Sequence, residues 1–424
     1  MSDIAVLSEA ETVQVVERRL DLAVSEFNVL SYKERRLHFS GGFLGEHSLA
    51  EITVRRIHDD NSTTTLHFFL KAKPASSPPQ LAVVEDTDAF IKEVCAVINI
   101  FGKFRSALND HGKSMEWTCE CYYTRPDLLV FDDLSKKGFR AFNLNDHMVY
   151  EHFALAMKAL ANLHSASIIY EERHPTQPHR LTDEYSDILK EKFMSDEPGC
   201  PGIISVNVTI KTVCTLIDLI YGQETASRIK SKVQAVMNLI FKLQRPSERF
   251  RNVACHGDIK RENILYLHDG DTPIDVRLVD FQLIRYAPPA NDIMCFLYLA
   301  TDEEIRDKCS SQLLAIYHAH LSQNLRLHGL NPDKILPWKE LEESCRVYKT
   351  LGILISIHYN PVILLKEQFI SHVLKNPEEF ERFANVDRSP VVTNGYRNDE
   401  SYRRRVKKVI EEFVRECIEK APEI

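Results

Sequence analysis

Three side chains near the middle of the chain have the types and the spacing that phosphoryl transfer requires. Asp258 and Asn263 lie five residues apart after the dipeptide His256-Gly257, and Asp280 follows a second apolar run. Phosphoryl transfer needs a carboxylate beside the attacking hydroxyl, and it needs oxygen ligands that hold Mg²⁺ on the nucleotide phosphates. We therefore expect Asp258 to act as the catalytic base, and Asn263 and Asp280 to bind the metal.

A predicted β-hairpin brings these groups together. Residues 264–267 and 276–279 have strand-like patterns, and the sequence between them contains the turn Asp269-Gly270-Asp271. Because Asp280 ends the return strand, the hairpin should place it beside Asn263. The alternative is that the three polar residues are ordinary turn and strand-cap residues. The spacing of Asp258 and Asn263 alone would favour that alternative, but its combination with His256-Gly257, the hairpin and Asp280 favours a catalytic role.

The same residues carry a resemblance to a known family. The run His256-Gly257-Asp258, with Asn263 and Asp280-Phe281-Gln282, resembles the small-molecule branch of the protein-kinase-like fold, which holds choline and ethanolamine kinases and aminoglycoside phosphotransferases. Residues 130–138 and 160–167 are similar to the insect ecdysteroid-kinase-like family within that branch. The resemblance implies an α+β, bilobal protein-kinase-like fold, with a small antiparallel-sheet N-lobe and a large helical C-lobe. It also implies ATP and Mg²⁺ as cofactors.

The resemblance assigns roles to two charged residues in the first lobe. Lys71 ends the apolar run 66–70 and matches the lysine that holds the α- and β-phosphates, and Glu93 matches its ion-pair partner on a helix. A lysine at the end of an apolar strand is costly to bury without a carboxylate or phosphate. Two alternatives stay open, namely a solvated strand-end lysine and the rival Lys73.

Other nucleotide contacts are expected from glycines and from the connector between the lobes. Gly42 and Gly45 could form a turn whose backbone amides face the phosphates, although they could equally form a plain hairpin turn. Residues 130–134, which include Phe131 and Asp133, would offer backbone groups to adenine.

The residues around the phosphotransfer loop indicate a small acceptor. Only nine residues separate Gln282 from Asp292, which is too short for the activation segment of a protein kinase. By resemblance, Asp292 should hydrogen-bond the loop around Asp258, and it could also cap a helix. Lys260 could neutralise charge on the transferred phosphoryl group, the alternative being a solvated lysine.

The remaining pattern predicts two lobes, residues 1–130 and 131–424. The first lobe should contain a helix in the first thirty residues that includes Phe27, antiparallel strands within 37–73, a helix at 86–103 and strands at 117–123 and 128–131. The second lobe should be helical apart from the hairpin, with helices at 146–164 and about 401–418.

Composition excludes several classes of protein. The 424 residues are 44% hydrophobic and 27% charged, with a net charge of −8, which is typical of a globular protein and argues against a nucleic-acid partner. Residues 1–26 do not resemble a secretory signal, and the most apolar runs contain charges, so we expect no membrane span and a cytoplasmic protein. The ten scattered cysteines are expected to be reduced thiols. No protein partner is inferred.

The acceptor is the least determined part of the prediction. The leading hypothesis is a kinase for a hydroxyl group of an ecdysteroid or a similar lipophilic alcohol. The alternatives are a choline, ethanolamine or xenobiotic kinase, and a catalytically silent ligand-binding protein. Six aromatic residues of the helical lobe are candidates to line the acceptor site, although core packing is the favoured role for each taken singly: Tyr170, Tyr185, Trp338, Tyr348, His358 and Tyr359.

Overall fold

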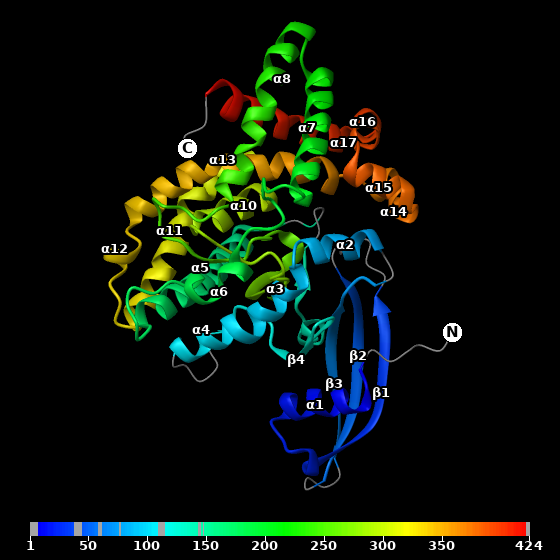
Figure 1. The fold of residues 1–424 in the computed structure, drawn as a ribbon, viewed down its shortest axis with the longest axis vertical. Helices are drawn as coiled ribbons and strands as arrows, with labels where there is room; N and C mark the ends of the chain where they lie inside the picture. The colour runs from blue at the N-terminus through cyan, green and yellow to red at the C-terminus, as the bar shows by residue number, and fades with distance from the viewer. Residues whose placement is uncertain are drawn as a thin grey trace.

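The computed structural model describes residues 7–37, 45–57, 62–75, 78–108, 115–142, 146 and 148–420. Within these residues, a five-stranded antiparallel sheet forms one end of the molecule and helices form most of the rest (Figure 1). The strand order is β1-β2-β3-β5-β4. The strands are β1 (Phe27–Leu37), β2 (Glu46–Arg56), β3 (Thr63–Ala72), β4 (Cys121–Arg125) and β5 (Leu128–Asp132).

Helix α1 (Glu9–Leu20) packs on the sheet and contributes to its core. Ser8 and Glu11 form a capping box at its start, and Val15 and Val16 are fully buried in the core cluster that contains the sheet residues. Asp21, with a φ of 54°, ends the helix in the left-handed conformation. The helix predicted to include Phe27 is therefore too long, because Phe27 begins β1.

The helix predicted at 86–103 begins at Ala89 and continues without interruption to Leu108, as three consecutive helical elements. They are α3 (Ala89–Cys95), a π-helical turn η2 (Ala96–Ile100) and α4 (Phe101–Leu108), and they follow α2 (Pro78–Asp86), which the sequence did not reveal. Asp88 precedes α3 with a φ of 52°, so the chain turns between α2 and α3. Because of this turn, Glu93 lies on α3 and not on a continuation of α2.

The C-terminal lobe is built on the long helices α5 (Tyr150–Arg173), α11 (Glu303–Leu327) and α13 (Trp338–Ile363). Figure 1 shows α7 and α8 projecting from this lobe on the side away from the sheet. The other helices are α6 (Thr182–Leu189), α7 (Pro201–Ile220), α8 (Gln223–Met237), α9 (Leu239–Leu243), α10 (Ala290–Ala300), α12 (Pro332–Ile335), α14 (Glu367–Lys375), α15 (Pro377–Asn385), α16 (Ser389–Asn398) and α17 (Glu400–Phe413), with short turns η1 (Val24–Glu26), η4 (Leu134–Lys137), η5 (Arg261–Asn263) and η6 (Val414–Glu419).

Two small sheets interrupt the helical lobe and carry the loops of interest. One has the order β6-β8-β9 and the other pairs β10 with β7. Their strands are β6 (Arg140–Ala141), β7 (Val253–Cys255), β8 (Ile264–Asp269), β9 (Thr272–Leu278) and β10 (Arg285–Ala287). The predicted hairpin is confirmed as β8 and β9, which pair antiparallel.

The two lobes have separate hydrophobic cores, but residues on both sides of position 130 contribute to the core of the helical lobe. Phe101, Phe104 and Trp117 belong to the core cluster of the helical lobe, and β5 extends to Asp132 within the N-terminal sheet. The boundary between the two lobes at residues 130 and 131 therefore stays a prediction.

Within the described residues, α7 alone is long and apolar enough to cross a membrane by length and composition, and 39% of its apolar window is buried against the rest of the protein.

Candidate functional site

Lys71 connects the sheet to helix α3 and to the hairpin of the helical lobe. Its Nζ donates to Oε2 of Glu93 at 2.5 Å and to Oδ1 of Asp280 at 2.6 Å. Lys71 and Glu93 are 5% and 1% exposed, so this pair is buried. The expected ion pair between Lys71 and Glu93 is present, whereas the rival Lys73 lies beyond the end of β3.

The three charges shift one another's pKa values in a consistent pattern. Burial disfavours the charge on Lys71, but Asp280 and Glu93 outweigh it and raise the pKa of the lysine. Burial also raises the pKa of Glu93, and here Lys71 only partly opposes it. At Asp280, burial is outweighed by Lys71 and Lys260, which lower the pKa of the carboxyl. Asp280 thus keeps the negative charge that a metal ligand needs.

The loop between β7 and β8 holds Asp258 in one orientation. Lys260 Nζ donates to Oδ2 of Asp258 at 2.8 Å, and Asn263 Nδ2 donates to the same oxygen at 3.0 Å and to the Asp258 carbonyl at 2.8 Å. Among the described residues, no donor contacts the second oxygen, Oδ1. The carboxylate is fixed through one oxygen, and the other is available to accept a proton.

Lys260 is a cation beside this carboxylate. Burial lowers the pKa of its amine, but the charges of Asp258 and Asp280 have the larger combined effect and raise it. Its side chain is 35% exposed, so it lies at the edge of the site. The structure thus brings Lys260 to the place that its predicted role requires, and that role stays a prediction.

Asp292 fixes the backbone of the catalytic loop. Its Oδ2 accepts from the backbone N–H of His256 at 2.6 Å, and its Oδ1 accepts from that of Gly257 at 3.0 Å. His164 Nε2 lies 3.1 Å from Oδ2. The expected contact with the loop is therefore confirmed. The helix-cap alternative is wrong, because α10 begins at Ala290 and Asp292 lies inside it.

His256 is buried beneath the loop as a neutral imidazole with a defined tautomer. Its Nε2 lies 3.0 Å from the carbonyl oxygen of Val279, to which it must donate, and its Nδ1 accepts from the backbone N–H of Asp258 at 3.3 Å. Burial lowers the pKa of His256, which agrees with the neutral form. This histidine joins the loop of Asp258 to the strand end that carries Asp280.

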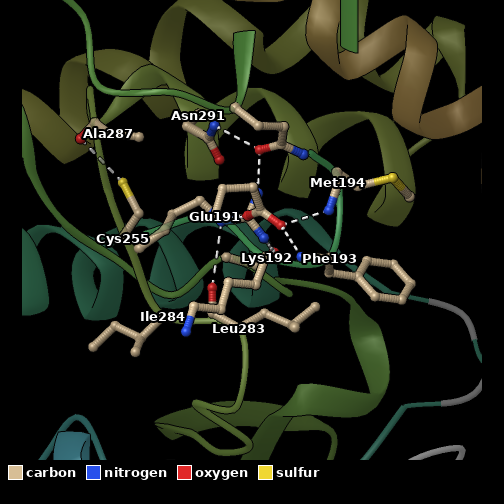
Figure 2. A network of polar contacts seen from close by, with 12 residues as sticks. Glu191, Lys192, Phe193, Met194, Cys255, Leu283, Ile284, Ala287 and Asn291 are labelled. Carbon is tan, nitrogen blue, oxygen red and sulfur yellow. Dashed lines mark hydrogen bonds and ion pairs between the residues drawn. The ribbon is translucent and has the colours of Figure 1, made fainter. Parts of the chain in front are cut away.

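Gly257 allows a close approach that no other residue would permit. Its φ is 82°, and a Cβ at this position would lie 2.0 Å from the carbonyl oxygen of Leu283. The buried Arg285 donates to the Gly257 carbonyl at 2.9 Å and pairs with Glu191 at 3.0 Å. Figure 2 shows the Glu191 carboxylate turned towards the backbone of Phe193 and Met194, whose N–H groups donate to it. Arg285 thus fixes the loop through its contacts with Gly257 and Glu191.

The segment after β9 places Asp280 beside Asn263. The N–H of Val279 donates to the backbone carbonyl of Asn263 at 3.0 Å, and Asp280 follows with a φ of 70°. Phe281 is 2% exposed and packs edge to face on Phe101, with ring centroids 4.8 Å apart. Its N–H also donates to Glu93 at 3.3 Å. The metal-ligand candidate is therefore anchored to both lobes.

Gln282 contributes its side chain to the same cluster. Its Nε2 donates to Oδ2 of Asp280 at 3.1 Å, and its Oε1 accepts from Lys71 at 3.2 Å. A glycine, which is usual at this position in protein kinases, could make neither contact. These two contacts hold the segment after β9 against Lys71.

Of the two glycines predicted to contact phosphate, the structure describes Gly45. Gly42 lies outside the described residues. Gly45 immediately precedes β2, and a Cβ there would lie 3.3 Å from Cε of Lys71. Gly45 is therefore next to the predicted phosphate-binding lysine, although its contact with phosphate stays a prediction.

The connector residues Phe131 and Asp133 are not joined to this cluster by a hydrogen bond or ion pair. Phe131 pairs in the sheet with Phe69 and Cys121. Asp133 donates its N–H to the His67 carbonyl at 3.2 Å and caps η4 through its carboxylate. Because both groups of Asp133 are already used, an adenine contact would need other backbone atoms. The role of the connector stays a prediction.

Of the six aromatic acceptor-site candidates, Tyr359 on α13 is influenced electrostatically by two charged residues of the catalytic loop. After burial, the charges of Asp258 and Lys260 are the largest influences on the pKa of Tyr359. Tyr348 is 3% exposed within the core, and Trp338 packs edge to face with His318 at the start of α13. Tyr348 therefore has the core role that was the alternative, whereas Trp338 is 37% exposed and lies outside the core.

Sequence reasoning missed two residues of the site. Arg285 lies inside an apolar stretch without any motif, so only its buried contacts reveal that it holds the loop. His47 on β2 stacks on Phe69 at 5.3 Å, and burial together with the charge of Lys71 lowers its pKa to about 4. No spacing rule relates either residue to the motifs.

The donor set suits Mg²⁺. Asp280 offers a charged carboxylate, and Asn263 offers an amide oxygen that accepts no hydrogen bond from a described residue. Together with a positioned carboxylate at Asp258 and a buried Lys71–Glu93 pair, this arrangement resembles the phosphotransfer site of the protein-kinase-like fold.

Comparison with family models gives the family of the chain. Residues 47–330 match the ecdysteroid kinase-like family, EcKL, and the chain belongs to it. No curated protein matches the chain. Among solved structures, Plasmodium vivax ethanolamine kinase is 12% identical, with a TM-score of 0.38, over 85% of this chain and 84% of that chain. The microcompartment-associated aminopropanol kinase is 10% identical, with a TM-score of 0.41, over 95% and 98%. The GDP and kanamycin complex of APH(2")-IIia is 8% identical, with a TM-score of 0.37, over 94% and 99%.

Proposed function

We propose that this protein transfers the γ-phosphoryl group of ATP, with Mg²⁺, to a hydroxyl group of a small lipophilic molecule such as an ecdysteroid. The observation that carries the proposal is the Asp258 carboxylate, which is fixed through Oδ2 and leaves Oδ1 available. Membership of the ecdysteroid kinase-like family supports the choice of acceptor. We also propose a cytoplasmic location, where ATP is supplied.

In the proposed reaction, Oδ1 of Asp258 accepts the proton of the acceptor hydroxyl. The hydroxyl oxygen forms a bond to the γ-phosphorus, and the bond from that phosphorus to the β,γ-bridging oxygen breaks, which gives a phosphate monoester and ADP. Lys71 would hold the α- and β-phosphates, and Lys260 would stabilise the charge on the transferred group. Asn263 and Asp280 would bind Mg²⁺, which would neutralise the phosphate oxygens.

The experiment is a transfer assay with labelled ATP and Mg²⁺ on a panel of an ecdysteroid, a sterol conjugate, choline, ethanolamine, a xenobiotic alcohol and a serine peptide. The proposal expects product from a lipophilic alcohol. Product from choline or ethanolamine alone would replace the acceptor class, and product from the peptide alone would overturn the small-acceptor argument. Nucleotide binding without any product would indicate a silent ligand-binding protein.

A further inference from the structure

Lys92 is a buried lysine whose hydrogen bonds all go to backbone carbonyls. It lies on α3 and is 2% exposed. Its Nζ donates to the carbonyl of Lys190 at 2.5 Å and to that of Ile284 at 3.3 Å, and within the described ranges it forms no ion pair. Burial lowers the pKa of Lys92 to about 8, with the charge of Glu191 partly opposing it, so the amine is largely charged at neutral pH.

The two carbonyls belong to different segments of the helical lobe. Ile284 closes the turn that follows Asp280, and its N–H donates to the Phe281 carbonyl at 3.1 Å. Lys190 begins residues 190–194, which lie between α6 and α7 and which we call the bridging segment. One ammonium on α3 therefore contacts both the turn after Asp280 and the bridging segment.

The bridging segment is itself tied to α3 and to the catalytic loop. Lys192 forms an ion pair with Asp88, the residue that precedes α3. Oε2 of Glu191 lies 3.0 Å from Nε of Arg285, which donates to the Gly257 carbonyl at 2.9 Å. The other oxygen of Glu191 accepts two backbone N–H groups of the same segment (Figure 2). A continuous series of contacts thus runs from the start of α3 to the catalytic loop.

A different side of α3 presents Glu93 to the predicted phosphate-binding lysine. Oε2 of Glu93 accepts from Lys71 at 2.5 Å, and its Oε1 accepts from the N–H of Phe281 at 3.3 Å. Consecutive residues of an α-helix point about 100° apart, so Lys92 and Glu93 anchor α3 on two different sides. A rotation or shift of α3 that withdrew Glu93 from Lys71 would also break the contacts of Lys92.

We propose that Lys92 is a positioning residue that fixes α3 on the helical lobe and keeps Glu93 within reach of Lys71 before any nucleotide binds. Its effect on phosphoryl transfer rests on the proposed function, whereas its effects on α3 and on ATP binding do not. Hydrogen bonds from an ammonium are stronger than those between neutral groups, which suits a side chain that holds one helix against two segments. The ATP site is then assembled in the free protein, without a separate movement of α3.

A double-mutant cycle tests whether Lys92 acts through Glu93. Lys92→Met removes the ammonium from an unbranched side chain, and Lys103→Met is the matched control, because Lys103 is an exposed lysine on α4. In titration calorimetry with ATP and Mg²⁺, Lys92→Met should bind roughly tenfold more weakly than the wild type and the control, because only molecules with α3 in place are competent. In a Glu93→Gln background, the same change should cost less than about twofold. Equal losses in both backgrounds, or no loss in either, would overturn the proposal.

Hydrogen exchange of residues 89–95 tests the position of α3 directly. We expect the wild type and Lys103→Met to protect these amides equally with and without ATP and Mg²⁺. In Lys92→Met, the same amides should exchange at least roughly tenfold faster, and the nucleotide should restore part of their protection. Wild-type amides that become protected only when ATP binds, or unchanged exchange in Lys92→Met, would contradict the proposal.

Kinetics separate this proposal from the proposed function. If an alcohol is phosphorylated, Lys92→Met should raise the KM for ATP and leave the KM for the alcohol unchanged. A lower melting temperature with an unchanged KM for ATP would mean that Lys92 only supports the fold, and would refute the positioning role. If no alcohol is phosphorylated, the proposed function fails, and calorimetry and hydrogen exchange still decide the role of Lys92.

Discussion

Replacing Lys71 with methionine removes the cation that two carboxylates share. Glu93 is 1% exposed, and the Asp280 side chain is 26% exposed. Removing one partner of a buried ion pair costs about 3–5 kcal/mol, because the remaining charge is uncompensated. Asp280 keeps its hydrogen bond from Gln282 and some contact with water, so we expect a loss of about 3 kcal/mol of unfolding free energy, near the lower limit.

The loss in Lys71→Met should also depend on pH. Burial raises the pKa of Glu93 above its usual value of 4.5, and removing Lys71 takes away the main opposing charge. A carboxyl whose pKa is higher in the folded protein binds a proton on folding, so its contribution is fully present below the unfolded pKa and is lost as the pH rises through the folded pKa. The stability that the variant loses relative to the wild type should therefore grow as the pH rises above 4.5.

Urea unfolding of Lys71→Met, Glu93→Gln and the double variant measures these effects, with Lys73→Met as a control two residues away. The double variant should be less destabilised than the sum of the single variants by more than about 1 kcal/mol, because it leaves one fewer uncompensated carboxylate. All variants without Lys71 should bind ATP more weakly. Losses that add within about 0.5 kcal/mol would refute the shared-charge reasoning.

Three further predictions concern two residues that support the catalytic loop and one residue of helix α1. Gly257→Ala should lower the melting temperature sharply and cost about 3 kcal/mol or more in urea unfolding, because a Cβ would meet the Leu283 carbonyl at 2.0 Å and the φ is positive. Asp292→Asn should lower kcat roughly 10- to 100-fold, with little change in ATP affinity, because an amide can no longer accept from both backbone N–H groups of the loop. Glu11→Gln should cost about 2 kcal/mol of unfolding free energy at pH 7. The reason is that hydrogen bonds from Ser8 and Arg125 outweigh burial and lower the pKa of Glu11 to about 2. In urea unfolding, the difference in stability between the variant and the wild type should shrink as the pH falls from 4.5 towards 2. An unchanged kcat for Asp292→Asn, or a Glu11→Gln effect that is constant with pH, would contradict the respective contact.

The parts of the site that follow from local sequence could be predicted. The hairpin β8–β9 brings Asn263 and Asp280 together within a few residues of chain, so turn chemistry and strand pattern were sufficient. The C-terminal helix was also legible, because Val406, Ile410 and Phe413 form one buried stripe at helical spacing.

The parts that depend on contacts between distant segments could not be predicted. Arg285 holds Gly257 and Glu191 only because β10 pairs with β7, and the chain between these residues carries no periodic signal of that pairing. The break between α2 and α3 depends on the left-handed conformation of Asp88, which the helical spacing of the apolar residues concealed.

The central claim is that Asp258 accepts the proton of an acceptor hydroxyl during phosphoryl transfer. The most direct measurement is the single-turnover rate of phosphate monoester formation by the wild type and Asp258→Asn, at saturating ATP and Mg²⁺. The account predicts a rate at least roughly 100-fold lower in the variant, with nearly unchanged ATP affinity. Equal rates in the two proteins would contradict it.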